Sequence, residues 1–115
     1  MIMASCDTAI RALCKSLGKD YRVTTIDFER VIYRDFGNGF NVEISGVHTT
    51  SKRKKATIYL WYGDKVFNCF IVDTIKDVAR EDIGEVVENL LDYSNGLIAS
   101  GLDTRDKLFN WKCNR

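Results

Sequence analysis

The sequence of 115 residues contains no proline and a single histidine. No apolar stretch approaches the length of about 20 residues that a helix needs to span a membrane. The first residues also lack the basic region and long apolar segment of a secretion signal. We therefore expect a cytoplasmic protein with no membrane partner.

Motifs for metal binding and catalysis are missing as well. Cys6, Cys14, Cys69 and Cys113 are widely scattered, without a Cys-x-x-Cys pair or a histidine cluster, and are expected to be reduced, mostly buried thiols. There is no Walker loop, no G-x-G-x-x-G and no zinc spacing. His48 is not spaced to activate a cysteine. The sequence predicts a protein that is not an enzyme and has no cofactor.

The composition is that of an ordinary globular protein. Hydrophobic residues make up 45% of the chain and charged residues 29%, and the formal net charge is +1. At this length the mixture predicts one domain, residues 1–115. The molecule is neither a polycation nor acidic overall, so any electrostatic function must depend on local clusters.

Helical periodicity marks both ends of the chain. A first helix is expected from Ser5 to Leu17, with Ser5 or Asp7 as its N-cap and Gly18 as the left-handed residue that closes it. A second, amphipathic helix is expected to begin at about Asp77 and to end near residue 96 or 99. Its apolar stripe consists of Ile83, Val86, Val87, Leu90 and Leu91. A short last helix, beginning after residue 103 or 104, would place Leu108 and Trp111 against the body.

The segment between these helices is predicted to form strands. Residues 21–34 fit one long strand with a bulge or two strands with a tight bend, because the alternation of apolar residues breaks near residues 27–30. Hairpin turns are expected at residues 37–39 and 63–64, which join residues 31–36 to 40–45 and residues 56–62 to 65–72. In the strand of residues 40–45, the side chains expected inward are Phe40, Val42 and Ile44, and those expected outward are Asn41, Glu43 and Ser45.

These elements together predict an α+β fold. It consists of an N-terminal helix, an antiparallel meander of four to five strands, an amphipathic C-terminal helix and a short terminal helix.

The hairpin of residues 56–72 carries apolar side chains on both faces, whereas an antiparallel sheet usually keeps one face polar. Either the helices cover both faces, or Tyr59 and Trp61 form an exposed patch for a protein partner, since Tyr and Trp dominate interface hot spots. A third hypothesis is a homodimer interface.

Two charged clusters offer further hypotheses. Four adjacent cations, Lys52, Arg53, Lys54 and Lys55, could bind phosphates while sheet aromatics stack on bases, or could form a solvated loop. Three carboxylates on the second helix, Glu85, Glu88 and Asp92, could dock on a basic protein surface, or could form the polar side of that helix.

The dipeptide Ile10-Arg11 and the run Lys19-Asp20-Tyr21-Arg22-Val23, leading into a small meander and out through an amphipathic helix, resemble the layout of small type II anti-CRISPR proteins from phages and mobile elements. The resemblance covers about the first third of the chain. It implies a compact inhibitor in the host-cell cytoplasm that binds a Cas9 nuclease, in some members through acidic residues. Because this chain is near neutral and has a basic run, a DNA-mimicking surface over the whole molecule is not expected.

The leading hypothesis is therefore a non-enzymatic inhibitor that binds a larger protein, such as a nuclease or nucleoprotein complex, through Tyr59, Trp61, Glu85, Glu88 and Asp92. The alternative is a nucleic-acid-binding module that uses residues 52–55 and the sheet aromatics.

Overall fold

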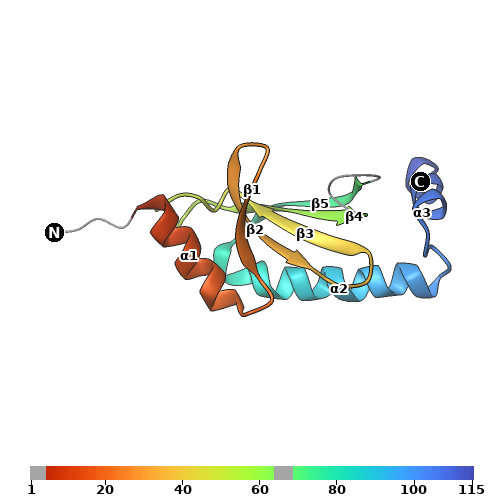
Figure 1. Ribbon diagram of the computed structural model, residues 1–115, viewed down its shortest axis with the longest axis horizontal. Helices are drawn as coiled ribbons and strands as arrows, with labels where there is room; N and C mark the ends of the chain where they lie inside the picture. The colour runs from red at the N-terminus through yellow and green to blue at the C-terminus, as the bar shows by residue number, and fades with distance from the viewer. Residues whose placement is uncertain (1–4, 64–68) are drawn as a thin grey trace.

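The computed structural model describes residues 5–63 and 69–115 and has the predicted α+β architecture (Figure 1). One helix precedes a five-stranded antiparallel sheet in the order β1-β2-β3-β4-β5, and further helices follow it. The elements are α1 (Cys6–Leu17), β1 (Arg22–Ile26), β2 (Glu29–Asp35), β3 (Phe40–Ser45), β4 (Ala56–Tyr62), β5 (Phe70–Val78), the 3₁₀ turn η1 (Arg80–Asp82), α2 (Ile83–Ala99) and α3 (Arg105–Cys113).

The first helix forms where its apolar spacing predicts it. Ser5 is the N-cap, and its hydroxyl oxygen accepts a hydrogen bond from the Thr8 backbone N–H at 3.1 Å. Ile10 and Cys14 are buried on the inner side of the helix. Gly18 ends the helix as expected, but with φ +127° and ψ 176°, which is an extended conformation open to glycine rather than the left-handed helical one.

Residues 21–34 form two strands, which decides between the two interpretations of that segment. β1 and β2 pair from Arg22↔Tyr33 to Ile26↔Glu29, and the turn between them contains Asp27 and Phe28. Both turn residues have positive φ, +50° and +66°, as a two-residue type I′ hairpin requires. The break in the alternation of apolar residues near residues 27–30 therefore corresponds to a hairpin turn that contains no glycine.

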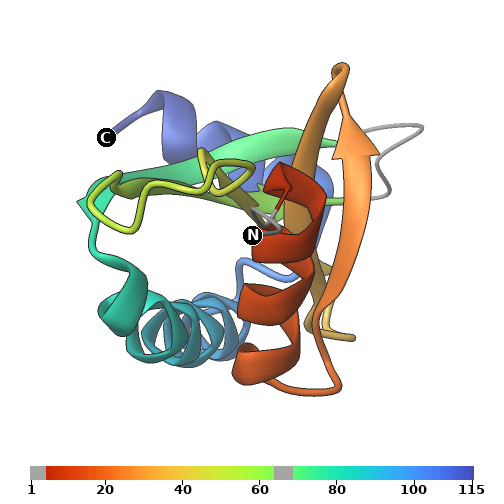
Figure 2. The same ribbon diagram turned by 90° about the vertical axis from the view of Figure 1, so that its left-hand side faces the viewer.

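The two main helices cover one face of the sheet. Figure 2 shows α2 end-on beneath the strands and α1 in front of β1 and β2. The core between helices and sheet includes Ile10, Val42, Leu60 and Val87. Burial of such side chains stabilises a fold by roughly 1.5–3 kcal/mol each. Val31 and Tyr33 are also buried but belong to the opposite face of the sheet, outside this core.

The end of the sheet differs from the prediction. The expected strand of residues 65–72 falls partly outside the described residues, as does the turn at Gly63-Asp64, and β5 continues to Val78. The pairing of β5 with β4 contains two register shifts, which accommodate the longer strand. Asp77, at φ +58°, lies opposite the shift between Ala56 and Ile58. The helix expected from Asp77 instead begins at Ile83, after η1. Pairing with β4 extends the strand beyond Val72, its expected end, to Val78, past the expected start of the helix.

The C-terminal helices agree with the sequence more closely. α2 passes Gly96 and ends at Ala99, one of the two expected ends. α3 begins after the N-cap Thr104, and its Leu108 is fully buried. From the end of α3, Lys112 Nζ donates to the Ile71 carbonyl, and Arg115 Nη2 donates to the Val72 carbonyl at 3.3 Å. These bonds occupy main-chain acceptors at the outer strand of the sheet, where an open edge would invite pairing with another chain.

Candidate functional site

Tyr59 and Trp61 lie on the face of the sheet opposite the main helices. Their strand alternates with the core residues Ile58 and Leu60, so the two aromatic side chains point away from α1 and α2. Both side chains are partly buried. In the part of the chain that the structure describes, neither α1 nor α2 packs on this face, which we call the open face (Figure 2).

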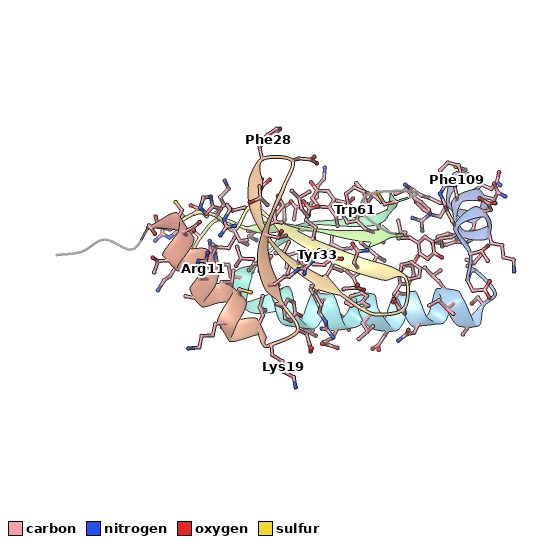
Figure 3. The ribbon with its side chains drawn as sticks, viewed as in Figure 1. Arg11, Lys19, Phe28, Tyr33, Trp61 and Phe109 are labelled. Atoms are coloured by element: carbon pink, nitrogen blue, oxygen red, sulfur yellow. The ribbon has the colours of Figure 1, made fainter. Side chains whose placement is uncertain are left out.

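Two exposed phenylalanines stand on either side of Trp61 (Figure 3). Phe28 caps the β1–β2 turn with an exposed fraction of 103%, and Phe109 on α3 has an exposed fraction of 41%. They are the large hydrophobic side chains that the described residues leave most exposed. Figure 3 places both on the same side of the sheet as Trp61, with Phe28 at the β1–β2 turn and Phe109 toward the α3 end of the molecule. The open face therefore has an aromatic floor with an exposed aromatic ring on each side of Trp61.

The polar residues of β3 on this face are buried, contrary to the outward solvent exposure expected from alternation. Asn41 has an exposed fraction of 4% and Glu43 of 7%. Alternation placed them on the correct face, but their cross-strand neighbours are Trp61 and Tyr59, whose large rings exclude water. Trp61 Nε1 donates a hydrogen bond of 3.2 Å to Glu43 Oε1, so the indole has a fixed orientation.

A hollow with acidic walls, which we call the acidic hollow, lies between the aromatic floor and the β1–β2 turn. Its volume is about 270 Å³, and Asp27, Glu29 and Glu43 line it together with Tyr59 and Trp61. No Lys or Arg is among its described lining residues. Glu29 Oε2 is held by Ser45 Oγ at 2.7 Å and the Gly46 N–H at 2.9 Å, so its carboxylate has a fixed position. Carboxylates beside aromatic faces favour a positively charged guest.

The predicted acidic residues of α2 do not join this face. Glu85, Glu88 and Asp92 are exposed on α2, which packs on the other side of the sheet. The predicted protein-binding set is thus divided between two sides of the molecule.

Glu88 already has an intramolecular partner, since its Oε1 accepts a 2.8 Å hydrogen bond from Arg34 Nη1. Arg34 also donates to the Tyr21 hydroxyl at 3.4 Å and lies over the Tyr21 ring. Burial opposes the charge on Arg34, but the hydrogen bonds to Glu88 and Tyr21 outweigh it and raise its pKa. For Tyr21, burial itself raises the pKa, because it disfavours the charged phenolate. These contacts tie α2 to β2, which gives Glu88 a structural role.

The basic run lies apart from the sheet aromatics. Lys52, Arg53, Lys54 and Lys55 are exposed in the loop between β3 and β4. This loop lies beside α1, beyond the β1–β2 hairpin from Trp61 (Figures 1 and 3). His48 Nε2 contacts Asp7 Oδ1 at 3.1 Å, and Arg80 donates to the Thr49 carbonyl at 3.2 Å, so the loop is tied to α1 and η1. Cations and aromatics therefore do not form one surface.

Phe28, Phe109 and Asn41 were not predicted as site residues. The break in alternation at residues 27–30 was a signal for Phe28, because it placed a phenylalanine in a possible turn. No signal in the sequence marked Phe109 or Asn41.

The described residues contain no group of three or more His, Cys, Asp or Glu side chains arranged to hold a metal ion. The four cysteines form no disulfide, but the expectation that they are mostly buried is wrong, because only Cys14 is buried and Cys113 is exposed. Burial raises the pKa of the Cys14 thiol. Among the helices of residues 5–63 and 69–115, none has both the length and the apolar character needed to cross a membrane. No protein-family model matches the chain, and neither a curated protein nor a solved structure is detectably similar to it.

Proposed function

We propose that this protein is a small non-enzymatic binding protein whose open face docks on a basic surface of a larger protein. The observation that carries the proposal is the placement of Phe28, Trp61 and Phe109 on one face that the main helices leave uncovered. Exposed aromatic rings around a partly buried tryptophan form the kind of surface in which interface hot spots occur.

The negative charge of the acidic hollow indicates which kind of partner fits the open face. Carboxylates of Asp27, Glu29 and Glu43 surround Tyr59 and Trp61 in the acidic hollow. Phosphate groups would be repelled there, whereas Lys and Arg side chains would gain ion pairs and cation–π contacts. A basic protein surface therefore fits this face better than nucleic acid does.

A nuclease that binds DNA presents such a basic surface. Together with the resemblance to type II anti-CRISPR proteins, this chemistry supports an inhibitor of phage or mobile-element origin that covers the DNA-binding surface of a host defence nuclease such as Cas9. Tyr59 and Trp61 remain in the proposed site, and Phe28 and Phe109 join them. Glu85 and Asp92 are left out because they lie on the other side of the sheet.

The test uses a panel of purified, guide-loaded type II Cas9 nucleases with a matching DNA duplex. The protein is expected to bind at least one nuclease and to inhibit cleavage. Trp61→Ala or Phe28→Ala should weaken binding about 30-fold, the effect of losing a hot spot of about 2 kcal/mol. The matched control is Trp111→Ala, which removes the other tryptophan, a residue that packs against the core from α3. Circular dichroism establishes that each variant is folded.

Two outcomes would overturn the proposal. If no nuclease in the panel binds, the nuclease target is rejected. If light scattering at micromolar concentration finds a dimer that Phe28→Ala dissociates, the open face is an interface between two copies of the chain.

A further inference from the structure

A second hollow opens on the same face, at the end of the sheet where the β2–β3 loop meets Gly63. Its volume is about 560 Å³, and its lining includes Arg22, Tyr33, Asp35, Asn41 and Tyr62. A smaller adjoining hollow of about 170 Å³ adds Asp20 to the same group. We call the larger one the polar hollow. None of these residues belongs to the acidic hollow or to the predicted sites.

Asn41, which lines the polar hollow, has a buried side-chain acceptor without a hydrogen-bond partner among the described residues. Its side chain is 96% buried, since its exposed fraction is 4%. Its Nδ2 donates to the Gly63 carbonyl at 3.2 Å, which fixes the orientation of the amide. The other end of the amide, Oδ1, is a buried acceptor with no hydrogen-bond partner among the described residues. Asn41 is among the residues that line the polar hollow, and a guest there that reaches Oδ1 with an N–H would supply that partner.

The walls of the polar hollow are held in place by the fold. Asp35 Oδ1 accepts a hydrogen bond of 2.8 Å from the Gly37 N–H, which fixes the carboxylate. Asn38 joins the same loop to α2, because its Nδ2 donates to Ser94 Oγ at 2.9 Å. Gly39 has φ +94°, which favours glycine, and a Cβ there would lie 3.1 Å from the Tyr62 ring, so a larger residue would push Tyr62 away from this loop. These contacts hold the described walls of the polar hollow in place.

Charge and aromatic rings specify which donor fits. Among the described lining residues of the combined hollows, Asp20 and Asp35 outnumber the cation Arg22. The guanidinium of Arg22 lies over the Tyr33 ring at 4.8 Å, so one ring of the polar hollow already binds a cation. Tyr62 offers a second ring, and Asp35 a carboxylate that can pair with a positive charge.

We propose that the polar hollow receives a lysine side chain of the bound protein, whose ammonium donates to Asn41 Oδ1 and pairs with Asp35. An ammonium is compact and carries three donors, whereas a planar guanidinium would compete with Arg22 for the Tyr33 ring. The inference rests on the proposed function for the source of the lysine, but the recognition itself is a property of this chain alone.

The experiment titrates the isotope-labelled protein with Nα-acetyl-lysine methylamide and follows backbone and side-chain amide signals by NMR. The signals of the Asn41 side chain, Gly39 and Gly63 should shift together, with a dissociation constant in the millimolar range. The matched probe is the same compound acetylated at Nε, which removes the charge, and it should leave these signals unchanged. Inorganic phosphate tests the opposite possibility, an anion bound by Arg22.

Two variants complete the test. Asp35→Asn keeps an acceptor for the Gly37 N–H but removes the charge, and it should weaken lysine binding about fivefold. Asn41→Leu should abolish binding, because it removes the Oδ1 acceptor; the domain should remain folded, since leucine is of similar size and the change costs only the hydrogen bond to the Gly63 carbonyl. Asp92→Asn, on the outer side of α2, is the control and should bind like the wild type.

Equal shifts from both lysine compounds, or shifts from phosphate at the same signals, would overturn the proposal. The outcome is distinct from that of the proposed function. If Trp61→Ala loses the target protein while Asp35→Asn and Asn41→Leu retain it, the open face is the interface and the polar hollow is not a lysine site. If lysine methylamide binds but no partner protein does, the hollow is a cation site and the docking proposal fails.

Discussion

Asp7 is the residue at which three parts of the fold meet. From the first turn of α1 its carboxylate pairs with Arg30 on β2 at 3.3 Å, and it contacts Arg11 at 3.9 Å and His48 at 3.1 Å. The hydrogen bond from Arg30, aided by the charges of Arg30, Arg11 and His48, lowers the pKa of Asp7 despite some opposing desolvation. Its place in the first helical turn favours the ionised form as well.

The sign of this shift predicts how stability depends on pH. Because the pKa of Asp7 is lower in the folded protein, its contribution is present above the unfolded value, about 3.9, and is lost as the pH falls through the folded value. Asp7→Asn should therefore lower the melting temperature at pH 7. The difference from the wild type should close in strongly acidic solution, where both side chains are neutral.

Thermal unfolding followed by circular dichroism across this pH range is the measurement. Asp92→Asn, which changes an exposed carboxylate on α2, controls for the loss of a negative charge. A gap of constant size at all pH values would mean that the Asp7 carboxylate has no such role.

At the scale of elements, the turn of the β1–β2 hairpin contains a strained residue that lowers the stability of the fold. Phe28 adopts φ +66°, a left-handed conformation that costs a residue other than glycine roughly 1–2 kcal/mol. Its exposed fraction of 103% means that the ring gains no packing in return. Such strain in an exposed aromatic residue is consistent with selection for binding rather than for stability.

This hairpin gives a prediction with two variants. Phe28→Gly should raise the free energy of unfolding by about 1 kcal/mol, because glycine adopts positive φ without a Cβ clash. Phe28→Ala should leave stability within about 0.5 kcal/mol, since an exposed ring contributes little and the strain remains. Both variants should bind the target weakly. Urea denaturation measures the stabilities, and a destabilised Phe28→Gly would show that the ring supports the turn.

The elements that the sequence predicted well are those with one uninterrupted period. The helical stripe containing Val87 and Leu90 was predicted correctly, and so were the bounds of β3, Phe40–Ser45. The last strand was expected to end at Val72 and the helix to begin at about Asp77, because a polar segment before an amphipathic helix favours the start of that helix. Residues 73–78 instead pair with β4, and two register shifts in this pairing accommodate the residues that break the alternation of side chains. Pairing of this kind depends on a distant partner that local sequence does not reveal.

At the scale of the whole molecule, the candidate site was predicted in part. Tyr59 and Trp61 stood out because β4 is apolar on both faces, and they lie on the face that α1 and α2 leave uncovered. Asn41 looked like an ordinary solvent-facing residue, since its burial comes from neighbouring strands and loops. The acidic residues of α2 fitted the hypothesis in charge, but only the three-dimensional arrangement shows that they lie behind the sheet.

The same arrangement separates the charges of a near-neutral protein into distinct regions. The cations of residues 52–55 lie beside α1, whereas the open face carries the acidic hollow. A nucleic-acid module would need cations next to stacking aromatics, but around Tyr59 and Trp61 carboxylates occupy that position. The acidic hollow should therefore give nucleic acid no combined site.

The corresponding prediction concerns a variant in which Lys52, Arg53, Lys54 and Lys55 are all changed to Gln. Wild type and variant should bind a labelled mixed-sequence duplex no better than non-specifically at physiological salt, with a dissociation constant of about 10⁻⁴ M or weaker. They should also bind the target protein equally, because these side chains lie outside the open face.

Fluorescence anisotropy at several salt concentrations measures the DNA affinity. If the four cations bound phosphates, log K would fall with log salt at a slope of about 3 to 4, and the variant would lose that dependence. Such a result would favour the nucleic-acid-binding alternative over docking to a protein.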